Sequence, residues 1–189
     1  MRKIVLYVLT SLDGAVDQPG HYFPSPAPRA GGPPVFDPVL AACEARMIAT
    51  QDAVLLGRRM FDEWADYWPT SDEQPFADFI NGVDKYVVTS TPLTASWGGA
   101  RAVQGPVAAV VADLRAGRGQ DIGVHGSIEL ARSLLREDLV DVLHLAVGPV
   151  VDPTGRRLFE DAGGHRHLEL IEATPTPAGS VWLSYRIPH

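Results

Sequence analysis

The chain has 189 residues, of which 46% are hydrophobic and 21% charged, and its formal net charge is −7 at neutral pH. This composition is that of an ordinary globular protein, and the length suits one domain over residues 1–189 with a core of its own. The acidic balance argues against a nucleic-acid partner, which usually needs a basic face. No apolar run approaches the roughly 18 residues of a membrane helix.

The first two thirds of the chain alternate strands with helices. Apolar runs predict strands at 3–10, 53–56, 86–89 and 121–125, and helical spacing predicts helices at 38–50, 58–66, 75–81, 105–116 and 127–137. Asp37 followed by Pro38 is typical of a helix start. The segment 18–37 is rich in proline and glycine, and it is long enough to be a functional loop over one end of the sheet.

The last third contains extended segments at 139–147, 167–173 and 180–187, with no long helix between them. Strands that alternate with helices and then follow one another directly indicate an α/β fold with a mixed sheet. We expect the sheet to be mainly parallel, with an antiparallel C-terminal edge. Trp182 in the last segment is expected in the core.

The single cysteine, Cys43, excludes an intramolecular disulfide. It lies among alanine and leucine residues of a predicted helix, so we expect a buried thiol, as is usual for free cysteine. The basic start and the apolar run at 4–9 are too short for a secretory signal. A reducing cytoplasm is the expected location.

Two strand-to-helix corners carry glycine. The first reads LLGRRM, with Gly57 followed by Arg58 and Arg59 at the start of a helix. Cations are unfavourable at this positive helix end unless an anion joins them. The second reads VHGS, where Gly126 and Ser127 open a helix whose free N–H groups would attract an anion. Each corner by itself is also compatible with a purely structural turn and solvated side chains.

The strand at 86–89 ends in three hydroxyl residues, Thr89, Ser90 and Thr91. The C-terminal ends of strands are where open α/β sheets bind ligands, although hydroxyl residues before a proline are also common in turns. His165 and His167 would share one face of a strand, but a third metal ligand is missing. We expect no metal site.

Taken in order, these motifs resemble one family. Ser11-Leu12-Asp13-Gly14 closes the first strand, and Leu56-Gly57-Arg58, Val88-Thr89-Ser90, Val124-His125-Gly126-Ser127 and Gly155-Arg-Arg-Leu-Phe follow. The set resembles the dihydrofolate-reductase-like superfamily, and most closely the reductase domain of the bifunctional riboflavin-biosynthesis deaminase/reductase and its stand-alone relatives. The resemblance implies a three-layer α-β-α fold with about eight strands, and NADPH lying across the strand ends.

The resemblance also implies a cofactor site. The nicotinamide would meet the end of the first strand and the following loop, phosphates would bind the Gly-Arg corner, the ribose 2′-phosphate would meet the hydroxyl residues, and the pyrophosphate would bind the later glycine corner. The corresponding residues here are Leu9, Thr10, Val16, Gly57, Arg58, Arg59, Thr89, Ser90, Gly126 and Ser127. Asp13 and the region from Asp66 to Trp68 are candidates for acid–base catalysis, and water or substrate is an alternative proton source.

The chain departs from the family pattern in three places. Met60 stands where a threonine is frequent, and His125 stands where the family has a glycine. In dihydrofolate reductases a carboxylate on the first helix binds the pterin. Counting back from Gly57 places Ala41 there, with Asp37 and Glu44 about a helical turn to either side. These departures argue against folate as the substrate. The deaminase half, with its zinc ligands, has no counterpart.

The resulting hypothesis is an NADPH-dependent reductase of a small heterocyclic or ribosyl substrate, resembling 5-amino-6-(5-phosphoribosylamino)uracil reductase or dihydrofolate reductase. One alternative is a nucleotide-binding module without catalysis. Another is a serine hydrolase that uses Ser127 with His125 or His144, although Glu129 replaces the second glycine of a nucleophile elbow. Neither a nucleic acid nor a membrane is expected as a partner, and the apolar C-terminal strands are compatible with a homodimer.

Overall fold

The computed structural model describes residues 1–23, 36–160 and 164–189. Most of the predicted loop at 18–37 therefore lies outside the described residues. The strands are β1 (Ile4–Thr10), β2 (Gln51–Gly57), β3 (Asp84–Val88), β4 (Ala100–Val103), β5 (Asp121–His125), β6 (Val142–Val147), β7 (Glu169–Pro175) and β8 (Val181–Arg186). The helices are α1 (Pro38–Ile48), α2 (Arg58–Tyr67), α3 (Phe76–Gly82), α4 (Val107–Ala116) and α5 (Ile128–Arg136), with 3-10 turns at Pro19–His21 and Trp68–Thr70.

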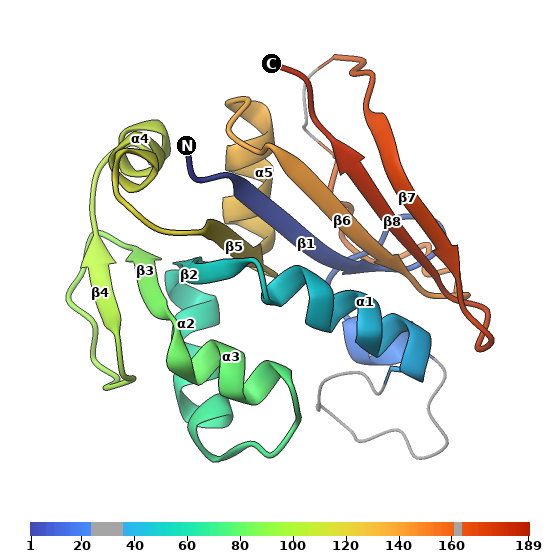
Figure 1. Ribbon diagram of the computed structural model, residues 1–189, viewed down its shortest axis with the longest axis horizontal. Coiled ribbons are helices and arrows are strands. Elements are labelled where there is room, and N and C mark those ends of the chain that lie inside the picture. Colours follow the sequence, from blue (N-terminus) through green and yellow to red (C-terminus); the bar gives the residue numbers. More distant parts are fainter. Residues whose placement is uncertain (24–35, 161–163) are drawn as a thin grey trace.

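All eight strands form one sheet, in the order β4-β3-β2-β5-β1-β6-β8-β7 (Figure 1). The six strands from β4 to β6 pair in parallel, and β8 pairs antiparallel with both β6 and β7. This arrangement confirms the mixed sheet with an antiparallel C-terminal edge. It also places β1 in the middle of the sheet, between β5 and β6.

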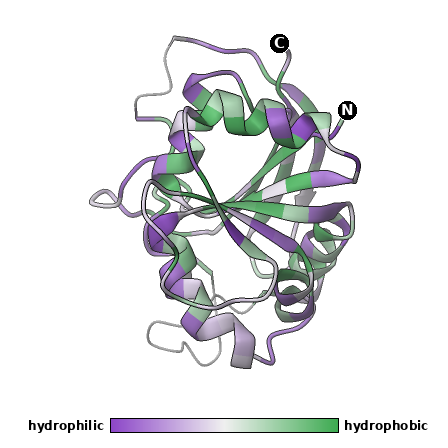
Figure 2. Ribbon diagram, turned by 90° about the vertical axis from the view of Figure 1, so that its left-hand side faces the viewer, coloured by the Kyte–Doolittle hydropathy of each residue, from purple (hydrophilic) through white to green (hydrophobic). Residues whose placement is uncertain are grey.

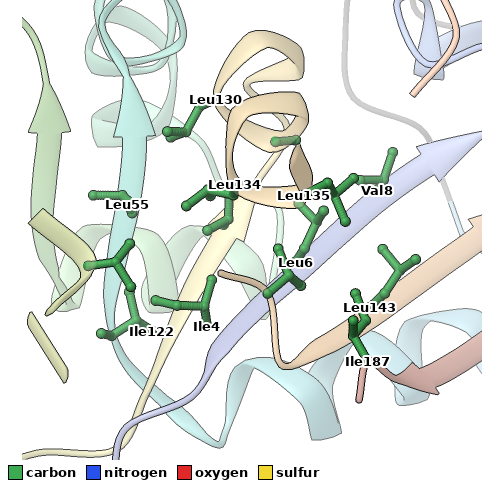
Figure 3. Close-up of a cluster of buried hydrophobic side chains, with 14 of the residues drawn as sticks. Ile4, Leu6, Val8, Leu55, Ile122, Leu130, Leu134, Leu135, Leu143 and Ile187 are labelled. Carbon is green, nitrogen blue, oxygen red and sulfur yellow. The ribbon is translucent and has the colours of Figure 1, made fainter. Parts of the chain in front are cut away.

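Helices cover both faces because the strands are apolar on both sides. Ile4, Leu6 and Val8 of β1 pack against α4 and α5, and Figure 3 shows Leu130, Leu134 and Leu135 of α5 above these strands. Val5 and Tyr7 point to the other face, where α1 packs. The expected three-layer architecture is thus confirmed, and hydrophobic residues concentrate in the central strands (Figure 2).

The predicted α1 begins as expected. The Asp37 carboxylate accepts hydrogen bonds from the backbone N–H groups of Val39 and Leu40, at 2.9 and 3.1 Å, and Pro38 occupies the first helical position. This capping satisfies two of the four N–H groups that a helix start leaves unpaired. The predicted burial of Cys43 and Trp182 is confirmed, with 2% and 1% of each residue exposed.

Two sequence interpretations are wrong in detail. The short strand β4 was not predicted, because its four residues are all at least partly exposed and form no apolar run. His165 and His167 are not on a strand, because β7 begins at Glu169, which pairs with the last residue of β8. Both histidines are exposed. Among the described residues, no helix is long and apolar enough to cross a membrane.

Candidate functional site

A cavity of about 1330 Å³ opens where the C-terminal ends of β1, β2 and β5 meet. Its wall is formed by these strand ends, by α1 and α2, by the segment 72–76, by the start of α5 and by residues 156–158. The volume exceeds the 300–1,000 Å³ typical of drug-sized ligand pockets. The position agrees with the rule that open α/β sheets bind ligands beyond the carboxyl ends of their strands.

The two glycine corners touch each other in this wall. The backbone N–H of Gly57 donates a hydrogen bond to Ser127 Oγ at 3.0 Å. Gly126 and Ser127 both have positive φ, 64° and 54°, so the chain turns from β5 into α5 within two left-handed residues. The sequence did not indicate this contact between the two corners, which the structure shows through Ser127 Oγ.

The N-terminus of α5 faces the cavity without a side-chain cap. Ser127 stands at the N-cap position, but its hydroxyl makes no capping hydrogen bond and instead accepts from Gly57. The first N–H groups of a helix are orphan donors unless capped, and the helix dipole favours an anion beside them. The corner is thus suited to a phosphate group.

Arg58 lies in the cavity wall, but most of its N–H groups are hydrogen-bonded to other residues of the protein. Its Nε donates to both oxygens of Asp62, its Nη1 to Thr91 Oγ1 and to the Pro92 carbonyl, and its Nη2 to Thr94 Oγ1. Among the described residues these partners use four of its five N–H groups. Arg58 thereby fixes the segment after β3 against α2 and leaves one N–H for a ligand.

Two further arginines line the cavity, and in the described part of the chain each of them makes only an exposed ion pair with a glutamate. Arg59 pairs with Glu63 along α2, and 89% of its side chain is exposed. Arg156 pairs with Glu129 in the first turn of α5. Exposed ion pairs contribute about 0–1 kcal/mol, so both arginines can exchange their partners for a phosphate at small cost.

The other predicted cofactor residues divide into two groups. Leu9 and Val16 line the cavity, whereas Thr10 is buried and donates to the Ser11 carbonyl. Thr89 and Ser90 lie outside the cavity wall, and Thr89 Oγ1 contacts Thr91. The Arg58 bond to Thr91 brings their segment next to the cavity.

Neither Asp13 nor Asp66 lines the cavity. Asp13 accepts hydrogen bonds from Ser11 Oγ and from the Asp152 backbone N–H, and it pairs with Arg157 at 3.0 Å. The Ser11 bond is the main reason why the pKa of Asp13 falls to about 2, so this group carries no proton near neutrality. Asp66 is exposed on α2.

Glu44 is the buried one among the carboxyl groups that line the cavity. It lies on the inner face of α1, is 9% exposed and lines the cavity together with Tyr7. Burial raises the pKa of Glu44 from 4.5 to about 7, while the nearby Tyr7 hydroxyl acts in the opposite direction. The pair makes no hydrogen bond of good geometry, and the Tyr7 hydroxyl has no partner among the described residues. Glu44 was not predicted as a candidate acid from the sequence. The signal that could have pointed to it is a charged residue within the apolar, alanine-rich stretch of the predicted helix at 38–50.

An aromatic wall completes the cavity near the 3-10 turn after α2. Trp64 packs edge to face against Trp68 and Phe76, with ring centroids 5.7 Å apart in both pairs. Phe76 also contacts the ring of His125, at 5.3 Å. The wall offers flat apolar surface to a planar ligand.

The geometry does not support a serine hydrolase. Ser127 Oγ is engaged by Gly57, His125 Nε2 contacts Gln51 Oε1 at 2.8 Å, and His144 Nδ1 contacts Ser184 Oγ at 2.8 Å. No described contact joins either histidine to Ser127, so the base that would activate a nucleophile is missing. In the part of the chain that the structure describes, no three potential metal ligands cluster.

The fold is an α/β sheet with a cavity at the carboxyl ends of its central strands, the position at which open α/β sheets bind ligands. Residues 2–182 match the family model of the RibD C-terminal domain. The chain belongs to the RibD C-terminal domain family, as the resemblance indicated. Membership places it among reductase-like proteins related to the riboflavin pathway.

Individual relatives agree with this assignment. The chain is 27% identical over 138 residues to the uncharacterized protein YyaP of Bacillus subtilis (strain 168), covering 71% of this chain and 73% of YyaP. A putative riboflavin biosynthesis protein from Shewanella sp. PV-4 has the same fold, with a TM-score of 0.72, 19% identity and 99% of each chain covered.

A longer structural relative is the diaminohydroxyphosphoribosylaminopyrimidine deaminase/5-amino-6-(5-phosphoribosylamino)uracil reductase of Thermotoga maritima. Its TM-score is 0.67 at 13% identity, with 99% of this chain covered. The chain spans 57% of the length of that protein.

Proposed function

We propose that the protein is an NADPH-dependent reductase that acts on a C=N or C=O carbon of a small heterocyclic substrate related to aminouracils. The observation that carries the proposal is the pair of joined glycine corners, which present the uncapped α5 N-terminus to the cavity. The name of the Thermotoga relative supports the substrate class.

The residues present fit the cofactor. Gly126, Ser127 and the first turn of α5 would hold the diphosphate, with Arg59 and Arg156 as counter-ions. Leu9 and Val16 would meet the nicotinamide, and the segment fixed by Arg58 would meet the 2′-phosphate. When bound, the cofactor supplies the hydride. Because its pKa is about 7, Glu44 can both hold and release a proton near neutrality, and it would give this proton to the heteroatom of the substrate.

Cofactor binding tests the proposal directly. We expect Arg58→Ala to weaken NADPH binding by roughly 10- to 150-fold, because a charge-assisted contact is worth about 1.5–3 kcal/mol and the segment at 91–94 loses its anchor. Arg58→Lys should recover only part, since a point charge cannot replace the guanidinium fork. The measurement is the Kd for NADPH and NADH by fluorescence titration at two salt concentrations.

The matched control is Arg101→Ala, which removes an exposed arginine of β4 that pairs with Asp84 of β3 and does not line the described cavity. It should bind NADPH like the parent. An Arg58→Ala protein with unchanged melting and unchanged NADPH affinity would show that phosphates do not bind this corner.

The rate of dihydrofolate reduction distinguishes a pterin reductase from a reductase of smaller heterocycles. We expect no more than marginal dihydrofolate reduction, because Ala41 stands in the cavity wall where the spacing places the pterin carboxylate. Any residual rate should be lost in Glu44→Gln and kept in Asp37→Asn, since Asp37 caps α1. Robust dihydrofolate turnover in both variants would contradict this expectation; the assay is absorbance loss of NADPH.

The alternative of a binding module without catalysis predicts a different result. It requires NADPH binding without turnover of any pyrimidine or pterin. Steady-state assays with both substrate classes distinguish it from the reductase.

A further inference from the structure

His125 stands where the family has a glycine. Its side chain forms part of the cavity wall and is held there by several specific contacts. It is 2% exposed and lines the cavity. The rings of Tyr7, Phe76 and Phe79 surround it, with centroids 5.9, 5.3 and 5.6 Å away. These contacts from β1 and α3 fix the plane of the imidazole.

A relay from β2 determines which imidazole nitrogen carries the proton. The amide nitrogen of Gln51 donates to Met47 Sδ at 2.9 Å, which leaves Gln51 Oε1 for His125 Nε2 at 2.8 Å. An amide oxygen only accepts, so Nε2 must carry the hydrogen. In a neutral ring, Nδ1 is then an acceptor with a free lone pair.

Gly123 allows the relay to cross the sheet. It lies between the two side chains on β5, and a Cβ there would overlap both Gln51 Oε1 and His125 Nε2. The Gln51–His125 bond therefore lies directly over the α-carbon of Gly123. Three positions on two strands are matched to hold one imidazole tautomer.

The ring stays neutral, and its acceptor lacks a partner. Burial, with a smaller contribution from His144, lowers the pKa of His125 from 6.5 to about 3. Nδ1 is buried, and among the described residues it has no hydrogen-bond partner. Buried polar atoms normally have partners, and an unsatisfied one costs about 1–3 kcal/mol.

We propose that His125 Nδ1, held as an acceptor by Gln51, binds an N–H group of the planar heterocyclic substrate in the cavity. The inference rests on the proposed function and assigns the substrate end of the site. Tyr7 and Glu44 line the same cavity and offer a hydroxyl group and a carboxyl group whose pKa is raised to about 7. The wall thus selects a heterocycle that carries a donor next to an acceptor, as aminouracils do.

Nitrogen NMR of the 15N-histidine-labelled full chain tests the assignment, with 5,6-diaminouracil as the probe. Of the six histidines, His125 should show the Nε2–H tautomer and remain neutral down to about pH 5. Adding the probe should move the Nδ1 resonance toward that of a hydrogen-bonded nitrogen. An Nδ1 that carries the proton, or that stays fixed up to the solubility limit of the probe, overturns the proposal.

Two variants separate the acceptor from its support. His125→Phe keeps a ring against Phe76 and Phe79 but should weaken probe binding by roughly 5- to 150-fold, because the ligand N–H is left unpaired. Gln51→Leu keeps the imidazole but frees its tautomer, so its Nδ1 signal should show partial protonation and its affinity should fall by less. His21→Phe is the matched control, since His21 also lines the cavity, and it should bind the probe like the parent.

Failure of the proposed role of His125 can be distinguished from failure of the proposed reductase function. The NADPH affinity of Gln51→Leu should equal that of the parent, because Gln51 is not among the described residues that line the cavity. The His125 variant adjoins Gly126, so its affinity for the probe is measured in the absence of NADPH. A parent chain that binds no NADPH would overturn the reductase proposal, while the Nδ1 response to the probe alone would still decide the role of His125.

Discussion

Replacing Glu44 by glutamine should raise the melting temperature at about pH 8 and leave it nearly unchanged at about pH 4. The carboxyl is buried on the inner face of α1, and its pKa rises from 4.5 to about 7. Between these two values the folded protein holds a proton that the unfolded chain has released. The stability that this proton supports is therefore present at low pH and lost as pH rises toward 7.

The shift of the Glu44 pKa corresponds to about 3 kcal/mol at alkaline pH. Glutamine removes the charge but keeps a buried polar group, so we expect a gain of about 1–3 kcal/mol, or a few to roughly ten degrees in a protein of this size. The measurement is thermal unfolding of both proteins across the pH range. Parallel profiles of the two proteins would show that Glu44 titrates like an exposed carboxyl.

The histidines act in the opposite direction, so the difference between variants is the quantity to measure. Burial lowers the pKa of His125 to about 3 and of His144 to about 4. As pH falls below about 6.5, both histidines bind protons in the unfolded chain but not in the folded protein. The free energy of unfolding therefore decreases as pH falls through this range. Glu63→Gln, on the exposed side of the cavity and paired with Arg59, is the matched control and should leave the profile unchanged.

Gly148→Ala should cause the largest loss of stability among the glycine substitutions, at least about 3 kcal/mol. Gly148 follows β6, and a Cβ there would overlap the backbone carbonyl of Tyr22. Tyr22 cannot withdraw easily, because it is 1% exposed and its hydroxyl bonds Asp17 and Asp152.

Chemical denaturation of the Gly148 variant measures this loss. Gly82→Ala is the matched control, because Gly82 has nothing within 4 Å of an added Cβ. Its stability should change by less than about 1 kcal/mol, in either direction. Equal stability of Gly148→Ala and the parent would mean that the segment at 18–22 is not seated against β6.

The sequence predicted elements wherever the pattern was local and long. Helix α1 carries its own start signal in Asp37 and Pro38, and the parallel strands are continuous apolar runs. The edge strand β4 has no such run, because pairing with β3 alone makes it a strand. The reach of β7 is likewise set by where β8 ends, which no local pattern encodes.

The sequence predicted those parts of the site that are formed by residues adjacent to one another in the chain. The two glycine corners are short motifs, and both line the cavity. Glu44, Tyr7 and His125 come from three separate elements, and only the register of the sheet and the rotation of α1 bring them together. Asp13 was selected for its position after the first strand, yet its hydrogen bonds tie it to Ser11 and Arg157.

The central place of β1 has a consequence for synthesis of the protein. Ile4 pairs with Ile122, and Val5 pairs with Val142, so the strand made first finds both neighbours only beyond residue 120 of the 189-residue chain. Closing such long loops is entropically costly, and topologies rich in distant contacts fold slowly. While the ribosome is still translating α4, the apolar β1 has no partner on either edge, and the growing chain exposes it to aggregation until β5 and β6 emerge.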